Sequence, residues 1–255
     1  MKVGLIGAGN MASALARGFA RPRDHAPELF VSDPDRVRAE SLAEATGATV
    51  LGSNAAVRDA AELVVLCHKP AQLDAVADEL GGAAPALVSI LWGVSTSTLE
   101  AAYPDVPVYR FMPNVAAELG VGVLCYAPGT RASEGPGAEV IELFERAGSI
   151  VPLSEELIDA AGALSACGPA FFALAAEALS EAGERRGLDR AEAARLTGET
   201  LAGTAALLRE SDYDTGALRT RVATPGGVTA KGLEALERRE LRAAFEDAVT
   251  AVVDG

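Results

Sequence analysis

The chain has 255 residues, enough for one large domain or two modest ones that each bury a core. Apolar residues make up 49% of it, which excludes a disordered protein. The net charge of −14 argues against a nucleic-acid partner, because phosphate binding needs clustered lysine and arginine. We find no uninterrupted run of about twenty apolar residues and expect no membrane span. The N-terminal stretch is too glycine-rich for a signal peptide, so we expect a cytoplasmic protein.

Strands and helices are predicted to alternate over the first 153 residues. Strands are expected at 2–6, 28–33, 48–53, 62–70, 86–93, 106–113, 122–129 and 149–154. Helices are expected at 13–20, 34–47, 54–61, 71–80, 95–103 and 137–148. This alternation indicates an α/β domain with a parallel, doubly wound sheet.

After residue 153 only helices are predicted, at 155–166, 169–187, 189–211, 229–241 and 242–255. The sequence therefore predicts two domains, an α/β domain at 1–153 and an all-helical domain at 154–255. Several of these helices carry alanine and leucine on more than one face, and such helices need a buried partner. We expect a homodimer with interleaved helices in this region, and a larger homo-oligomer is compatible with the same pattern.

Cysteine and histidine are too few and too scattered for metal chemistry. Cys67, Cys125 and Cys167 are far apart and odd in number, which argues against a disulfide framework and a zinc site. His25 and His68 are the two histidines of the chain and cannot build a multi-histidine site. No metal is expected.

The stretch GAGNMA follows the first predicted strand and matches G-x-G-x-x-A. Gly7 permits the tight turn, Gly9 lets a pyrophosphate reach the backbone, and Ala12 allows close packing of helix on strand. The helix N-terminus then faces the phosphates, and Asn10 and Met11 are assigned to the same site. The motif predicts a Rossmann-type dinucleotide-binding domain.

Asp33 ends the second predicted strand. A carboxylate there would accept hydrogen bonds from the adenosine ribose hydroxyls and favour NADH over NADPH. Arg36 and Arg38 are close and could instead hold a 2′-phosphate. The alternative for Asp33 is a cap on the helix that begins at Pro34. We expect NADH or NADPH as cofactor, with NADH favoured.

The fourth predicted strand ends in CHKP at the carboxyl edge of the sheet, where ligands bind in such folds. Lys69 and Pro70 are predicted to line the cofactor site. Cys67 is interpreted as a packed small side chain, and His68 as structural rather than as a proton donor.

Two further strand ends each allow two interpretations. Trp92 either walls the nicotinamide pocket or packs in the core. Asn114, in the stretch that also contains Arg110 and Pro113, either binds the nicotinamide or caps the following segment.

Pro225, Gly226 and Gly227 separate two helical segments and are soon followed by Thr229. Two adjacent glycines remove every β-carbon from a short piece of backbone, so a ligand can approach its N–H groups. The following helix directs its N-terminal end to the same place. On these residues alone an ordinary turn is the simpler interpretation.

Nearly the whole chain resembles the pyrroline-5-carboxylate reductase family, whose members make proline. The most specific similarity is VATPGGVTAKGLEALE, which resembles the family pattern T-S-P-G-G-T-T. The others are VGLIGAGNMASAL, SNAAV with Asn54, HKP, RFMPN, LSACGPAFF and GLDRAEAARLTGETLAGTA. The resemblance implies reduction of 1-pyrroline-5-carboxylate to L-proline with NAD(P)H, and it adds Asn54 to the expected cofactor residues.

The resemblance also implies how the Pro-Gly-Gly loop acts. The N–H groups of Val228 and Thr229 would hold the substrate carboxylate, Gly226 and Gly227 would give access to them, and Thr224 would lie beside them. The Thr229 hydroxyl would reach the ring nitrogen, which makes Thr229 the expected catalytic residue. The dimer would bring this loop to the nicotinamide.

The chain departs from the family pattern near the expected pocket, at Val115, Cys167, Phe171, Trp92 and His68. A divergent relative that reduces another cyclic imine or a carbonyl is therefore an alternative. A dinucleotide-binding regulator without turnover is a second one, against which the intact Pro-Gly-Gly loop argues.

Overall fold

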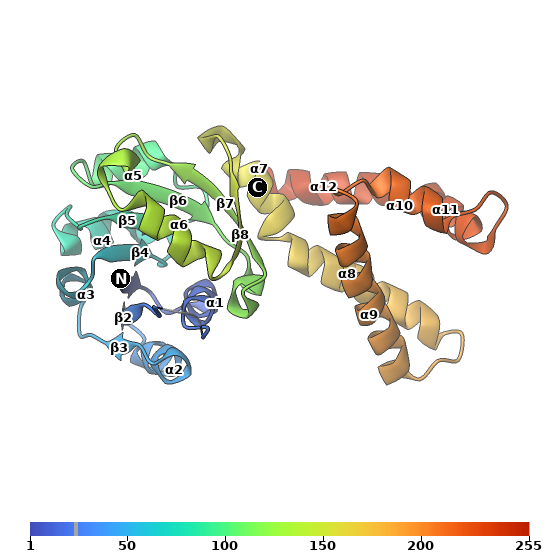
Figure 1. The fold of residues 1–255 in the computed structure, drawn as a ribbon, viewed down its shortest axis with the longest axis horizontal. Coiled ribbons are helices and arrows are strands. Elements are labelled where there is room, and N and C mark those ends of the chain that lie inside the picture. The colour runs from blue at the N-terminus through green and yellow to red at the C-terminus, as the bar shows by residue number, and fades with distance from the viewer. Residues whose placement is uncertain (23–24, 255) are drawn as a thin grey trace. The chain divides into compact units, whose positions relative to one another are not determined.

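The computed structural model describes residues 1–22 and 25–254. The chain forms two compact units, residues 1–167 and 168–255. Figure 1 shows the strands and their covering helices in the first unit and the helices of the second.

The first unit is built on an eight-stranded sheet with the order β3-β2-β1-β4-β5-β6-β7-β8. The strands are β1 (Lys2–Ile6), β2 (Glu28–Ser32), β3 (Thr49–Val50), β4 (Leu63–Leu66), β5 (Leu87–Ser89), β6 (Val108–Met112), β7 (Gly122–Pro128) and β8 (Gly148–Pro152). The strand order reverses between β1 and β4. From β1 the chain adds β2 and β3 toward one edge of the sheet, and from β4 it adds β5 to β8 toward the other edge. In open α/β sheets the ligand crevice lies outside the carboxyl ends of the strands at such a point.

One strand pair departs from the parallel arrangement that the alternation of strands and helices predicts. β6 and β7 pair antiparallel, with Met112 opposite Cys125, whereas the other described pairs are parallel. The connection between them contains only the short 3-10 helix η2 (Val115–Leu119). A parallel connection needs a crossover of about a dozen residues or more, so this short link returns the chain antiparallel.

Helices cover both faces of the sheet, as a doubly wound fold requires (Figure 1). Val3 and Leu5 of β1 point into one core together with Phe19 and Phe144, whereas Ile6 points into the other core. The helices are α1 (Asn10–Phe19), α2 (Arg36–Thr46), α3 (Asn54–Ala60), η1 (Pro70–Gln72), α4 (Leu73–Leu80), α5 (Thr96–Ala102), η3 (Ala132–Glu134), α6 (Gly137–Glu145), η4 (Glu155–Leu157) and α7 (Ile158–Ser165).

The first unit extends beyond the predicted domain boundary at residue 153, because α7 packs on the sheet. Ile158 is fully buried against Met112, Cys125 and Ala127. The sequence shows α7 only as one more apolar helix, and its packing partners are distant strands.

The second unit contains five helices in the part of the chain that the structure describes. They are α8 (Gly168–Glu184), α9 (Arg190–Glu210), α10 (Thr215–Val222), α11 (Val228–Arg238) and α12 (Leu241–Val253). The α10 helix is not among the predicted elements. Asp214 caps it by accepting a 2.8 Å hydrogen bond from the Ala217 N–H.

Segment 155–184 is long and apolar enough, by length and composition, to cross a membrane. This differs from the expectation that the chain holds no such segment. An apolar helix that packs against protein has the same length and composition. Part of this segment, α7, lies packed on the sheet of the first unit.

Candidate cofactor and substrate sites

The glycine-rich loop joins β1 to α1 and has the geometry that its sequence predicts. Gly7 has φ +108° and donates a 2.8 Å hydrogen bond to the Ser32 carbonyl. A β-carbon on Gly7 would lie 3.0 Å from the Cys67 carbonyl group, so only glycine fits without strain. A β-carbon on Gly9 would meet no described atom within 4 Å. Gly7 therefore closes the loop, and Gly9 leaves the N-terminus of α1 open to a ligand.

Asp33 faces this loop and does not cap the following helix. Its Oδ2 accepts a 2.7 Å hydrogen bond from the Ala8 N–H, and its Oδ1 accepts one of 2.7 Å from the Asp35 N–H. The cap of α2 is Asp35, whose Oδ1 accepts from the Val37 N–H at 3.1 Å. The alternative of Asp33 as a helix cap is therefore wrong.

A cavity of about 490 Å³ lies at the carboxyl ends of β1, β2 and β4. It brings together five of the predicted cofactor residues, Gly7, Gly9, Asp33, Asn54 and Lys69. Arg38, His68 and Glu79 line it as well. The parallel register sets Ile6 beside both Ser32 and Leu66, so the residues that follow these strands meet at one edge.

The other predicted cofactor residues lie elsewhere. Asn10 lines a neighbouring cavity of about 800 Å³ among α1, α2 and η2, together with Arg38. Met11 packs against the hydrophobic core, and Pro70 is exposed at the start of η1. The spacing of a motif does not show which side chain of a helical turn faces the ligand.

The two arginines near Asp33 differ in their surroundings. Arg36 is exposed and pairs with Glu40 at 2.7 Å on the surface of α2. Arg38 lines the cavity, and its Nε lies 3.2 Å from Asp35 Oδ2. Of the two arginines, Arg38 is therefore the one that a 2′-phosphate in the cavity could meet, and it forms an exposed ion pair with Asp35.

His68 is half-buried after β4. Its Nδ1 lies 2.9 Å from the Lys69 carbonyl oxygen, so the neutral ring donates from Nδ1 and Nε2 carries a lone pair. Nε2 is buried and has no hydrogen-bond partner among the described residues. Burial lowers the pKa of His68, although the Lys69 carbonyl and the Glu79 charge oppose the shift. A neutral ring of this kind fits the structural interpretation better than that of a proton donor.

Cys67 also agrees with the structural interpretation. Burial raises the pKa of its thiol, so the thiolate that a nucleophile needs is disfavoured.

Trp92 and Asn114 both make internal contacts. Trp92 packs so closely on α7 that a β-carbon on Gly162 would lie 2.7 Å from its ring. Asn114 donates from Nδ2 to the Ser165 carbonyl at 3.0 Å, and its Oδ1 accepts from the Val123 N–H at 3.2 Å. Its side chain does not cap η2. Each residue thus ties the end of a central strand to α7 or β7.

A buried ion-pair cluster, which sequence reasoning missed, fastens α7 to the sheet. Arg110 of β6 is 2% exposed and donates to Glu155 Oε1 at 2.7 Å and to Asp159 Oδ1 at 2.6 Å. An arginine inside the apolar strand VYRFM is the signal that could have revealed it, because a buried charge needs a partner.

The Pro-Gly-Gly loop of the second unit is a tight turn at the start of α11. Gly227 donates a 2.9 Å hydrogen bond to the Thr224 carbonyl, and Gly226 has φ +74°. Proline followed by a glycine with positive φ is typical of a type II turn. A β-carbon on Gly227 would lie 2.7 Å from Thr224 Oγ1, so the hydroxyl of Thr224 packs against the glycine.

This turn leaves the N-terminal N–H groups of α11 accessible. The first N–H groups of a helix have no partner within it, and Lys231 is the first residue of α11 that donates back to Gly227, at 3.4 Å. Val228 is 86% exposed, and Thr229 follows it. The loop thus presents backbone donors, without a β-carbon at Gly226 or Gly227, as an anion-binding site does.

Two family models match the chain. Residues 155–255 match "Pyrroline-5-carboxylate reductase dimerisation", and residues 2–93 match "NADP oxidoreductase coenzyme F420-dependent". The pyrroline-5-carboxylate reductase of Synechocystis is 34% identical over 98% of this chain and 95% of its own length. The chain belongs to the pyrroline-5-carboxylate reductase family.

Solved structures of the family have the same fold. The pyrroline-5-carboxylate reductase of Streptococcus pyogenes superposes with a TM-score of 0.90 at 30% identity and covers 100% of this chain and 97% of its own. The enzyme of Plasmodium falciparum, solved with NADP bound, has a TM-score of 0.85 at 26% identity, covering 100% and 96%.

The region that matches the family's dimerisation domain exposes many large apolar side chains. They include Phe172, Leu174, Leu179, Leu196 and Leu201, each more than two-fifths exposed. Helices with such surfaces need a partner, which agrees with a dimerisation domain in this family.

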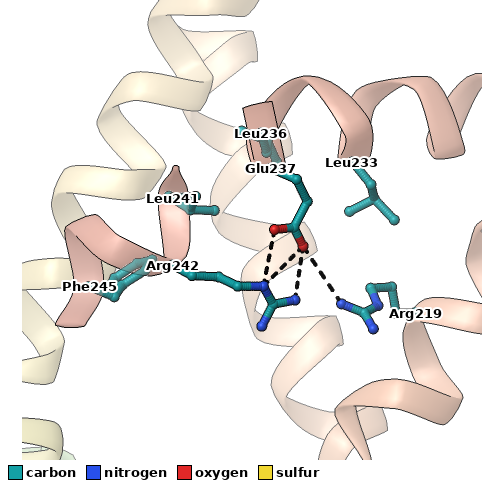
Figure 2. Close-up of a pocket in the computed structure, with 7 residues that line it drawn as sticks. All are labelled: Arg219, Leu233, Leu236, Glu237, Leu241, Arg242 and Phe245. Atoms are coloured by element: carbon teal, nitrogen blue, oxygen red, sulfur yellow. Dashed lines mark hydrogen bonds and ion pairs between the residues drawn. The ribbon is translucent and has the colours of Figure 1, made fainter. Parts of the chain in front are cut away.

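A cavity of about 290 Å³ lies among α10, α11 and α12 of the same region (Figure 2). Its apolar lining includes Leu233 and Phe245, and Glu237 lies between Arg242 at 2.9 Å and Arg219 at 4.0 Å. The two arginines lower the pKa of Glu237. None of the predicted site residues lines this cavity.

Proposed function

We propose that this protein reduces 1-pyrroline-5-carboxylate to L-proline with a nicotinamide dinucleotide as hydride donor. The observation that carries the proposal is the open Pro-Gly-Gly turn at the N-terminus of α11 in a member of this family. It offers backbone donors to a small carboxylate, and the glycine-rich loop offers the N-terminus of α1 to a pyrophosphate.

In this proposal the substrate carboxylate binds the N–H groups of Val228 and Thr229. Gly226 and Gly227 admit it, because a β-carbon on either would narrow the approach. Thr224 supports the turn through its carbonyl and lies against Gly227. The Thr229 hydroxyl orients the ring nitrogen of the imine.

The reaction places a hydride on the imine carbon, and the electron pair of the C=N bond moves to the nitrogen, which takes a proton. The cofactor supplies the hydride when it is bound. Cyclic imines are basic enough to arrive partly protonated, so the protein needs mainly to position its two partners. Oriented proximity can lower the barrier by roughly 7–11 kcal/mol at best.

The cofactor residues in this proposal are Gly7, Gly9, Asn10, Met11, Asp33, Asn54, Lys69, Pro70 and Asn114. The open helix N-terminus at Gly9 and the adjoining cavity of about 490 Å³ fit a dinucleotide. Three of these residues would act through packing or positioning. Met11 packs against the core, Asn114 donates a hydrogen bond to the Ser165 carbonyl, and Pro70 starts η1.

NADH is the favoured cofactor in this proposal. The carboxylate of Asp33 lines the cavity and would accept hydrogen bonds from ribose hydroxyls, and the ion pair with Asp35 offsets the charge that Arg38 would offer to a 2′-phosphate. The exposed apolar helices support a homodimer, in which the turn at α11 completes the site at the nicotinamide. We also assign the protein to the cytoplasm.

Absorbance of the nicotinamide band tests the proposal. Purified protein receives pyrroline-5-carboxylate with NADH or NADPH in turn, at low and high salt, and proline is assayed as product. Oxidation of the cofactor with matching proline formation is expected. Cofactor binding without turnover would redirect the search to a six-membered cyclic imino acid, and failure with that substrate too would favour a binding protein.

A further inference from the structure

Glu79 of α4 reaches the same edge of the sheet as Asp33. It lines the cavity of about 490 Å³ and also an adjoining cavity of about 380 Å³ at the carboxyl ends of β2 and β3. Asp33 and Asn54 line both cavities too. These three side chains therefore come from three separate parts of the chain and border both cavities.

A directed hydrogen-bond chain links Glu79 to Asn54 and Ser32. The Asn54 Nδ2 donates to Glu79 Oε2, and the Ser32 hydroxyl donates to Asn54 Oδ1 at 2.6 Å. A carboxylate can only accept, so Glu79 sets which end of the amide faces it. The amide oxygen then faces Ser32, and the serine hydroxyl must donate.

The smaller cavity is lined by negative charge alone, whereas the larger cavity also has basic side chains. The lining of the smaller cavity contains the carboxylates of Asp33 and Glu79 and, among the described residues, no lysine, arginine or histidine. The larger cavity adds Asp35, Arg38 and Lys69, but Arg38 is paired with Asp35. A phosphate beside Asp33 and Glu79 would meet two carboxylates, whereas hydroxyl groups would meet two acceptors.

We infer that Glu79 is a second cofactor-selecting residue beside Asp33, which favours a dinucleotide with free ribose hydroxyls over its 2′-phosphorylated form. The inference rests on the proposed function, because it requires a nicotinamide dinucleotide in this cavity. It assigns to α4 a part in selection that is usually given to the loop after the second strand.

The test compares dissociation constants of NADH and NADPH, measured by nicotinamide fluorescence without substrate. Glu79→Gln removes the charge and keeps an oxygen that can accept from Asn54. We expect its preference to shift toward NADPH by about fivefold to tenfold, mainly through tighter NADPH binding. Glu79→Ala removes the charge and the hydrogen bond, and it should show the same shift with weaker binding of both cofactors.

Asp78→Asn is the matched control, because Asp78 is an exposed carboxylate on the same helix that lines neither cavity. It should leave the ratio unchanged. An unchanged ratio in Glu79→Gln, or an equal shift in Asp78→Asn, would overturn the inference. With saturating imino acid, the ratio of the KM values of Glu79→Gln for NADH and NADPH should change in the same direction as the ratio of the dissociation constants.

The outcomes for the two proposals are separable. Binding of both dinucleotides by the unaltered protein without reduction of any imino acid defeats the proposed function, and the ratio in Glu79→Gln still decides the inference. Proline formation with an unaltered ratio in Glu79→Gln defeats the inference alone. Binding of neither dinucleotide defeats both.

Discussion

The carboxylate of Asp33 holds the glycine-rich loop through the backbone N–H of Ala8, at 2.7 Å. Its second oxygen accepts from the Asp35 N–H, also at 2.7 Å. One side chain thus connects the end of β2 to the loop before α1 while it lines the cavity between them. A change at Asp33 should therefore alter both the loop and the choice of cofactor.

Asp33→Ser should weaken NADH binding about tenfold and NADPH binding less, because a lost hydrogen bond to a charged group costs about 1.5–3 kcal/mol. The measurement is the dissociation constant of each cofactor. Glu44→Ser, an exposed carboxylate on α2, is the control. Equal weakening of NADH and NADPH binding would show that Asp33 supports the loop and does not select the cofactor.

Thr229→Ala should lower turnover about tenfold, as the loss of one orienting hydrogen bond predicts, with cofactor affinity unchanged. Thr229→Ser retains a hydroxyl and should recover much of the rate. The measurements are kcat with pyrroline-5-carboxylate and the dissociation constant of the cofactor. Full activity in the alanine variant would remove Thr229 from the mechanism.

Gly227→Ala should raise KM for the imino acid, because the new β-carbon would lie 2.7 Å from Thr224 Oγ1 and would narrow the turn. Cofactor affinity should not change. Gly232→Ala, inside α11 with no described atom within 4 Å of the new β-carbon, is the control. It should keep the same KM and stabilise the helix by about 0.5–1 kcal/mol. The same rise in both variants would contradict a special role for the turn.

Protonation of His68 should lower the stability of the first unit in mild acid relative to neutral pH. Burial lowers its folded-state pKa below the ordinary value of 6.5, so the unfolded chain binds the proton more readily. The contribution of the neutral His68 ring to the stability of the folded state is complete above that ordinary pKa. It is lost as the pH falls through the lower folded-state pKa.

Urea unfolding, followed by the fluorescence of the single tryptophan, Trp92, measures this effect. The free energy of unfolding should fall less between about pH 7.5 and about pH 5.5 in His68→Asn than in the unaltered protein. His25→Asn, which replaces an exposed imidazole, is the control. Identical pH profiles for His68→Asn and the unaltered protein would refute the prediction.

Glu155→Ala should destabilise the first unit by about 2 kcal/mol or more, because it removes a partner of the buried Arg110 guanidinium. Glu40→Ala, which breaks the exposed pair with Arg36, should cost under about 0.5 kcal/mol. Urea unfolding monitored by Trp92 fluorescence compares the two variants. Equal and small losses would show that Asp159 alone suffices for Arg110.

Features that depend on neighbouring residues were predictable from the sequence. The glycine-rich loop and the Pro-Gly-Gly turn require backbone angles that glycine adopts readily, and both Gly7 and Gly226 have positive φ. Apolar spacing likewise predicted most helices and strands. It did not predict α10, whose sequence TGALRTRV has little apolar periodicity and which begins at the Asp214 cap.

Features that depend on distant residues required the folded chain. The antiparallel β6–β7 pair, the packing of α7 on the sheet and the partners of Arg110 all join segments that are far apart in sequence. The same holds at the cofactor cavity, where Asp33 accepts a hydrogen bond from the Ala8 N–H and Asn54 donates one to Glu79. Local sequence limits backbone angles and places apolar residues on one face, but which side chains meet depends on how the whole sheet is assembled.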